Sequence, residues 1–272
     1  MRKSHLTVAI VLLTMVPCLA GCSPAAKQGT LQLYANGEDF VRQGFVSKDG
    51  WAITFDHVYI TLTDITAYQT SPPYDPHSGG DIKSNEKVDL SGTHTVDLAE
   101  GGEDAPPILV GEVSGAVVGQ YNAISWKMAK ATSGPASGGP ASGYSLITIG
   151  TAQKGGQTVD FTIKVETEYT YGCGEYVGDD RKGILDADGT ADLEMTFHFD
   201  HIFGDADTPL ADDLNLSAPG FEPFAGAAEG GKLDADMAAL RAKLSADDYQ
   251  VLVDTLLTLG HVGEGHCHCG AH

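Results

Sequence analysis

The last twelve residues of the chain, 261–272, combine several side chains that bind transition metals. The segment reads HVGEGHCHCGAH and contains four histidines and two cysteines. Imidazole nitrogens and thiolate sulfurs are the preferred ligands of zinc and copper. The spacing matches no closed zinc finger such as C-x2-C, but the density of donors predicts a metal site, with a loose, disulfide-bonded end as the alternative. The expected ligands are His261, His266, Cys267, His268, Cys269 and His272.

A second group of donors lies inside the chain, in the segment HFDH at 198–201. If this segment is a β-strand, His198 and Asp200 face the same side and can chelate one ion through nitrogen and oxygen. His201 can join them only if the strand ends or bulges, as the Gly204 that follows permits. We expect His198, Asp200 and His201 to form the best internal metal site.

A five-residue pattern, FDHVY at 55–59 and FDHIF at 199–203, occurs twice. Strand alternation would place the histidine of each copy, His57 or His201, on the same face as its flanking aromatic residues. A histidine among aromatic rings is a good neutral ligand, although a core histidine bonded to backbone carbonyls is the simpler interpretation. Our hypothesis is that His57, His198 and His201 form a half-site that the C-terminal tail completes.

The N-terminus predicts export and lipid attachment. Arg2 and Lys3 precede a short apolar stretch that ends in Leu19-Ala20-Gly21-Cys22. This stretch resembles the lipobox of bacterial lipoproteins, which implies cleavage before Cys22 and lipidation of its sulfur; the alternative is a secretory signal peptide with a chance cysteine. The resemblance implies a membrane partner through the lipid anchor. It also implies a location in the cell envelope, at the outer membrane facing the periplasm or the cell surface.

Charge narrows the range of partners. The chain has 16 Lys and Arg against 37 Asp and Glu, a net charge of −21, which becomes −23 once residues 1–21 and their two basic residues are removed. Such a surface repels phosphate backbones and attracts cations, so nucleic-acid binding is excluded.

Three cysteines remain after export and lipidation, namely Cys173, Cys267 and Cys269. Because the compartment is oxidising, a disulfide is the default for two of them. Either Cys173 pairs with one tail cysteine and leaves the other free, or the thiols share a metal ion.

The spacing of apolar residues predicts an all-β antiparallel sandwich, or a barrel-like variant, with a small C-terminal pair of helices. Turn residues at Lys154–Gln157 and Asp188-Gly189 separate strands. The expected organisation is a signal peptide at 1–21, a tether at 22–30, the β domain at 31–204, an acidic irregular connector at 205–231, a helical pair at 232–260 and the tail at 261–272. Ser245 is expected to cap the second helix and Gly260 to follow its end.

Common enzyme signatures such as G-x-S-x-G, H-E-x-x-H and the P-loop are missing from the sequence. We therefore expect a non-enzymatic, lipid-anchored protein that binds zinc, or else copper, for capture, storage or hand-over to a metal transporter or receptor in the envelope. One alternative is a structural or adhesive module with a disulfide-bonded tail. Another is a metal-dependent hydrolase using Glu166 or Glu168 as a base. The aspartates of 204–213 also offer a weak calcium site.

Overall fold

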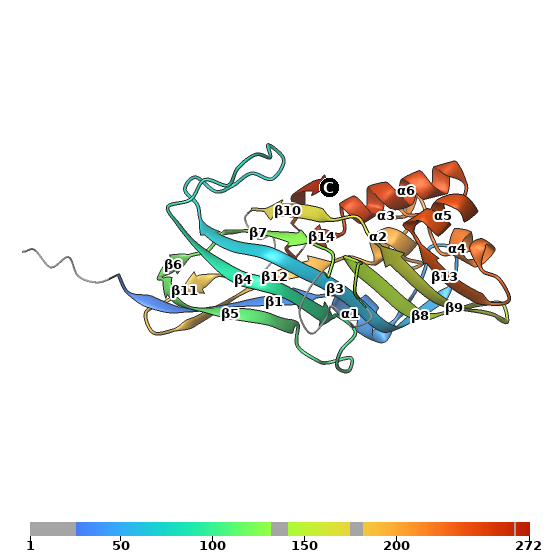
Figure 1. Ribbon diagram of the computed structural model, residues 1–272, viewed down its shortest axis with the longest axis horizontal. Helices are drawn as coiled ribbons and strands as arrows, with labels where there is room; N and C mark the ends of the chain where they lie inside the picture. Colours follow the sequence, from blue (N-terminus) through green and yellow to red (C-terminus); the bar gives the residue numbers. More distant parts are fainter. Residues whose placement is uncertain (1–25, 132–140, 175–181, 264) are drawn as a thin grey trace, which may run out of the picture.

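The computed structural model describes residues 26–131, 141–174, 182–263 and 265–272. Two β-sheets lie face to face, and short helices cover one end of the larger sheet (Figure 1). This predominantly β fold with helices near the C-terminus confirms the fold class expected from the sequence. The lipobox and Cys22 lie outside the described residues.

The larger sheet has nine strands. They are β2 (Phe45–Val46), β3 (Ala52–Gln69), β4 (Glu86–Asp97), β7 (Ala123–Met128), β8 (Leu146–Lys154), β9 (Gln157–Val165), β10 (Tyr169–Cys173), β13 (Lys232–Asp236) and β15 (Cys267–Ala271). Their order is β13-β9-β8-β3-β7-β10-β15, and β2 and β4 also pair with β3. Most of the last six residues of the C-terminal tail therefore form an ordered strand of this sheet, β15.

The smaller sheet has four strands and positions the candidate site. They are β1 (Gln28–Asn36), β5 (Ile108–Val117), β12 (Thr190–Phe197) and β14 (Gly260–His261), in the order β14-β12-β1-β5. Two short strands, β6 (Gly119–Gln120) and β11 (Ile184–Leu185), pair separately. The β1–β12 and β13–β9 pairs are parallel, so the expectation of antiparallel pairing throughout was wrong for them. Each pair joins segments far apart in the chain, which leaves room for the long crossover that parallel strands need.

Six helices were found in the described residues. They are α1 (Glu38–Gln43), α2 (Asp200–Phe203), α3 (Asp213–Ser217), α4 (Glu222–Ala227), α5 (Met237–Lys243) and α6 (Ala246–Leu257). As predicted, the Ser245 side chain caps α6 by accepting the N–H of Asp248. The connector expected to be irregular contains α3 and α4, and the segment expected as a helical pair begins with strand β13.

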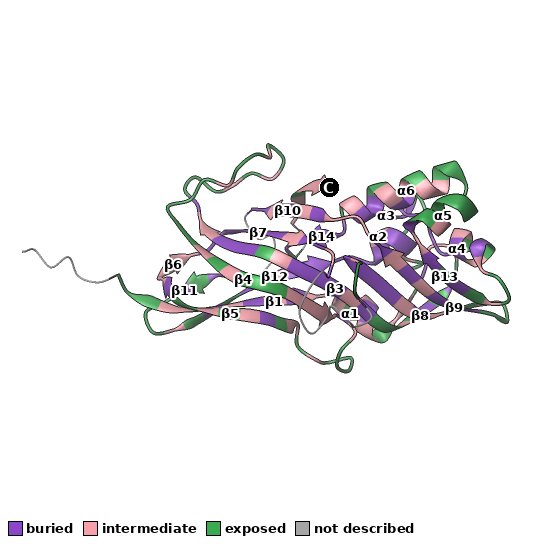
Figure 2. Ribbon diagram, viewed as in Figure 1, coloured by how far each residue is buried: buried purple, intermediate pink, exposed green. Residues whose placement is uncertain are grey.

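The core lies between the two sheets and beneath the helices. Trp126 of the larger sheet contacts Phe197 of the smaller one with ring centres 6.2 Å apart. Leu252 and Leu256 lie on the inner face of α6 and are buried, whereas other residues of this helix are exposed (Figure 2). Burying a large apolar side chain contributes about 1.5–3 kcal/mol, so this shared core fixes the relative position of the sheets.

Local turn chemistry agrees with the sequence at the β8–β9 hairpin. Lys154 pairs with Gln157, and the two residues between them, Gly155 and Gly156, have φ of 57° and 82°. Positive φ at both central positions matches the twist of the strands and is readily adopted by glycine. The predicted turn is confirmed.

Strand alternation was predicted wrongly for both copies of the FDH pattern. In β3 a bulge lies between Phe55 and His57, so Phe55 faces the core while His57 is exposed. The extra residue in the bulge reverses the alternation beyond it. In the second copy β12 ends at Phe197, and the next residues form α2, which buries both Phe199 and Phe203.

In the described part of the chain, we found no helix that combines the length and the apolar character needed to cross a membrane.

Candidate metal centre

The end of β12 positions the first two histidines. The strand delivers His198 to the edge of the core, where it is only 6% exposed. The chain then turns into α2, and the backbone N–H of His201 donates to the His198 carbonyl at 3.3 Å. This turn puts both imidazoles on the same side, with ring centres 5.2 Å apart. His201 joins the site because the strand ends, which is the condition that the sequence set.

The end of α6 positions the third histidine. After the helix, Gly260 and His261 form β14, which pairs with Thr196 and Phe197 of β12. The backbone N–H of His198 donates to the Leu259 carbonyl at 3.1 Å and holds the two segments together. His261 is 4% exposed as a result.

Gly260 does not act as the left-handed helix-ending residue that we expected, because β14 begins there. A Cβ atom at this position would lie 2.8 Å from Tyr171 Cε1 and 3.0 Å from Trp126 Cζ2. Glycine is needed here for close packing against two rings, which lets His261 approach β12.

A tight turn positions the fourth histidine. Val262 and Gly265 exchange two backbone hydrogen bonds, of 3.2 and 2.9 Å, and so place the flanking His261 and His266 beside each other. Gly263 has φ of 51° and donates its N–H to Thr196 Oγ1 at 3.2 Å, which ties the turn to β12. The ring centres of His261 and His266 are 5.3 Å apart.

The imidazoles form a compact cluster. The ring centres of His198 and His261 are 4.5 Å apart, and those of His201 and His261 are 5.0 Å apart. A zinc–nitrogen bond of about 2.0–2.1 Å and tetrahedral geometry would place two imidazole centres about 5 Å apart. Donor atoms of His198, Asp200 and His201 also lie within 4.8 Å of one another; His261 and His266 are not in this group and join the cluster through ring contacts alone. Two ligands of a tetrahedral zinc are about 3.4 Å apart, so the side chains would have to rotate toward one another to share an ion.

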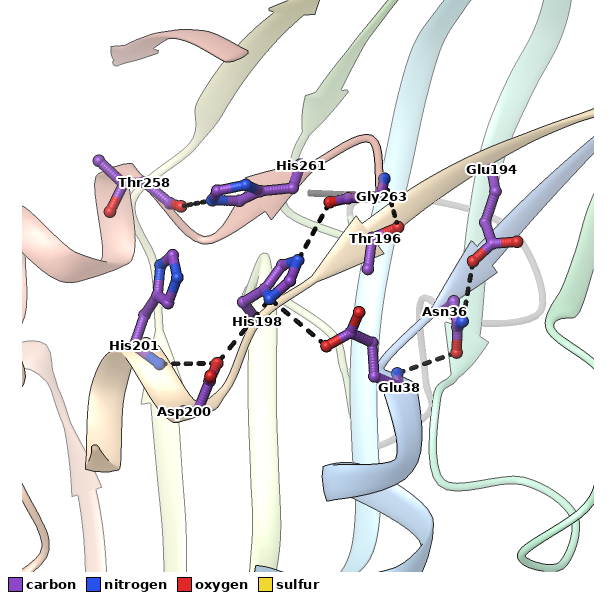
Figure 3. Close-up of polar contacts among 10 residues, drawn as sticks. All are labelled: Asn36, Glu38, Glu194, Thr196, His198, Asp200, His201, Thr258, His261 and Gly263. Carbon is purple, nitrogen blue, oxygen red and sulfur yellow. Dashed lines mark hydrogen bonds and ion pairs between the residues drawn. The ribbon is translucent and has the colours of Figure 1, made fainter. Parts of the chain in front are cut away.

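His198 is held by oxygen acceptors on both ring nitrogens (Figure 3). Its Nδ1 lies 3.4 Å from Glu38 Oε2 and 3.9 Å from Asp200 Oδ1, and its Nε2 lies 3.3 Å from the Gly263 carbonyl. A carboxylate on the far nitrogen of a metal-binding histidine fixes the ring and raises its basicity. Nε2 is therefore the nitrogen suited to an ion, which would replace the Gly263 carbonyl as its partner.

Glu38 was missed by sequence reasoning, because nothing in its local pattern marks it. It begins α1 with φ of 58°, an uncommon value for a residue other than glycine. Its backbone N–H donates to Asn36 Oδ1 at 2.9 Å, and Asn36 Nδ2 donates to Glu194 Oε1 at 2.8 Å (Figure 3). Backbone strain held by such a network is common at functional sites, and here it aims a carboxylate at His198.

Burial keeps two of the imidazoles neutral. Burial, and then the neighbouring His198, lower the pKa of His201 to about 4 and that of His261 to about 3. His261 Nε2 lies 2.9 Å from the Thr258 carbonyl, which places the ring proton on Nε2 and leaves the lone pair on Nδ1. Burial also raises the pKa of Asp200, against the opposing effect of His198. Neutral imidazoles with fixed tautomers are the form that binds metals.

His57 is not brought to this cluster. Its Nδ1 pairs with Asp97 Oδ2 at 2.7 Å, its ring stacks on Tyr59, and 47% of its side chain is exposed. The donors that converge among the described residues do not include it. The half-site that included His57 is therefore corrected, and the bulge in β3 is the physical reason.

The cysteines form a disulfide between Cys173 and Cys267, which leaves Cys269 free. The bond fastens β15 to β10, where the two residues are paired in register. Cys267 therefore offers no thiolate to a metal ion, which corrects its place among the expected ligands. Burial raises the pKa of Cys269 to about 11, so this thiol is protonated at neutral pH.

The remaining tail histidines lie apart from the cluster. His268 projects from β15 toward Gly79, where an added Cβ would meet its ring, and His272 Nε2 contacts Thr170 Oγ1 at 3.1 Å. In an extended strand His268 points away from its neighbours in sequence. The order imposed by β15 thus separates these side chains from His261 and His266.

The aspartates of 204–213 have local roles. Asp205 accepts the N–H of Asp207 and the hydroxyl of Thr208, and Asp212 caps α3 by accepting the N–H of Leu214. These carboxylates shape turns, and the converging donors in the described residues do not include them.

No protein-family model, curated protein or solved structure matches this chain.

Proposed function

We propose that this protein binds one transition metal ion at the cluster of His198, His201, His261 and His266. The observation that carries the proposal is the mutual contact of three imidazoles, with ring centres 4.5–5.2 Å apart, from two distant chain segments. Glu38 and Asp200 both face His198 Nδ1 and orient the ring so that Nε2 is left for the ion. Ordinary core packing would not require two buried imidazoles, His198 and His261, to share one corner with the half-buried His201.

Zinc is the favoured ion and copper the next. With Cys267 in a disulfide and the Cys269 thiol protonated, the cluster offers imidazole nitrogens rather than thiolates. This donor set favours zinc or Cu(II) over the thiophilic Cu(I). The role we propose is capture, storage or hand-over of the ion by a lipid-anchored protein of the cell envelope, with a transporter or receptor as partner.

A hydrolytic role has less support. Glu166 Oε2 accepts the N–H of Met237 at 3.3 Å, and Glu168 pairs with Lys127 at 2.6 Å. Both carboxylates therefore have structural partners away from the cluster. The rival function, a structural or adhesive module, rests on the disulfide that fixes the tail.

The deciding experiment is the metal content of protein purified without a His-tag, with free thiols titrated in the same sample. We expect about one zinc per chain. The double variant H198A/H201A should lose it, whereas H57A, which removes an exposed histidine outside the cluster, should keep it. Equal metal content in the double variant would refute the site, and metal-free wild-type protein after zinc loading would favour the structural module.

A further inference from the structure

A cavity of about 360 Å³ opens beside the histidine cluster. His201, His261 and His266 line one side of it, so these rings face an open volume rather than packed core. A water molecule in the liquid takes up about 30 Å³, and pockets that bind small molecules have volumes of about 300 Å³ or more. The cavity is therefore large enough for a small organic molecule next to the ion.

The cavity is also lined by hydrogen-bond acceptors. Thr255 and Thr258 line it, and both hydroxyl protons are used within α6 and its end: Thr255 donates to the Val251 carbonyl at 2.8 Å, and Thr258 donates to the Thr255 carbonyl at 3.2 Å. Toward the cavity these hydroxyls can offer only lone pairs. Asp213, an exposed residue, also lines the cavity.

The remaining lining is compatible with a compact ligand. Leu214 supplies an apolar surface, and Ser217 lies at the exposed side of α3. A ligand that fits must offer a lone pair to the ion and N–H groups to the wall. Carboxylates and phosphates offer neither donors nor the right charge beside Asp213. Imidazoles and amines offer both.

We propose that the bound ion accepts one ligand beyond its histidines on the side of this cavity, and that a small imidazole- or amine-bearing molecule supplies it. The proposal rests on the proposed metal site and names its second ligand class. Such a molecule would bind the ion through one nitrogen and donate N–H bonds to the wall of Asp213, Thr255 and Thr258. The metal would then be held, delivered or collected as a ternary complex with a small nitrogenous chelator.

The test uses the protein loaded with Co(II), whose visible spectrum reports its coordination. Titration with imidazole should change this spectrum in a saturable way while the cobalt stays bound after dialysis, and acetate should bind at least about tenfold more weakly. L214W should fill the cavity and weaken imidazole binding at least about tenfold. L216W, on an exposed neighbour of the same helix, should not. S217F narrows the cavity from its exposed side and serves if L214W misfolds.

Each outcome bears on the proposal. Three outcomes would overturn the second-ligand site and leave the metal site intact. They are a spectrum that does not respond to imidazole, an equal response to acetate, and an imidazole affinity in L214W and S217F equal to that of the wild type. Loss of cobalt to imidazole would show that no ternary complex forms and would also overturn it. Failure of the wild-type protein to bind cobalt or zinc at all would overturn the metal site itself.

Discussion

The imidazole of His261 lies 4.5 Å, ring centre to ring centre, from that of His198, although His261 follows the last long helix and His198 directly follows strand β12 of the smaller sheet. The contact is fixed by backbone bonds, since His198 donates to Leu259 and β14 pairs with β12. The cluster is thus built by rigid elements rather than by a loose tail.

Zinc should stabilise the folded chain through this contact. At a free concentration about 100 times its Kd, zinc should raise the free energy of unfolding by about 2.7 kcal/mol. H261N should abolish most of the effect, and H57N should leave it unchanged. Denaturant unfolding with zinc and with EDTA measures the difference. The same zinc response in H261N would contradict the role given to His261.

Glu38 should set the affinity of the site without being a ligand. E38Q keeps the size of the side chain but removes the charge facing His198 Nδ1, and loss of such a partner typically weakens metal binding about 10–100-fold. D39N removes the same charge from the exposed neighbouring residue and should have little effect. Competition with a coloured zinc chelator measures both, and equal affinities of E38Q and wild type would show that Glu38 does not position His198.

Gly260 should be intolerant of even one added methyl group. G260A forces a Cβ against Tyr171 and Trp126 and should cost about 1–3 kcal/mol of stability while it displaces His261. G226A is the matched control, because a Cβ there meets nothing within 4 Å. The midpoint temperature of thermal unfolding and the zinc content should both fall in G260A and stay unchanged in G226A. Wild-type zinc affinity in G260A would show that the close packing at Gly260 is not needed to position His261.

The disulfide should contribute stability through the long segment that it closes. Cys173 and Cys267 are 94 residues apart, and the loop-entropy relation gives about 4–5 kcal/mol for such a loop. C173A/C267A should therefore unfold at a lower denaturant concentration. It should also bind zinc more weakly, because His266 directly precedes the released residue 267. Unchanged stability would indicate that pairing of β15 with β10 is sufficient without the bond.

The thiol of Cys269 should react slowly with alkylating reagents. With its pKa raised by burial from 9.0 to about 11, its thiolate fraction at pH 8 should be about 100-fold below that of an ordinary cysteine. Because the folded state holds this proton more tightly than the unfolded state, Cys269 also lowers stability as pH rises from about 9 to 11. The rate of Cys269 alkylation in a C22S variant, measured as a function of pH for the folded chain and again in denaturant, tests this prediction. Rapid labelling of the folded chain at pH 8 would contradict the burial of the thiol.

The sequence predicted the elements better than their registers. Strand patterns, the glycine turn at Gly155-Gly156 and the cap at Ser245 follow from local chemistry, and the structure has all three. The bulge beside His57 does not follow from local pattern, because one extra residue in a strand leaves no compositional trace yet reverses the side chains that follow it. That single residue removed His57 from the site.

The site itself could be predicted only in part. Donor types and spacing marked His198, His201 and the tail, and Gly204 indicated that the strand would end nearby. Glu38 had no such signal, since its contact with His198 depends on the parallel pairing of β1 with β12 and on a backbone conformation set by Asn36. Long-range pairing of this kind is decided by the whole fold and not by neighbours in sequence.

The parallel pairing of β1 with β12 also has a consequence for biogenesis. The segments that surround the cluster begin near Asn36 and finish at His266, so nearly the entire polypeptide must have emerged and collapsed before the imidazoles can meet. Folds dominated by such non-local contacts mature slowly. A chain that is still being synthesised therefore carries only isolated, weakly chelating side chains, and an ion would be loaded only after nearly the whole chain has folded.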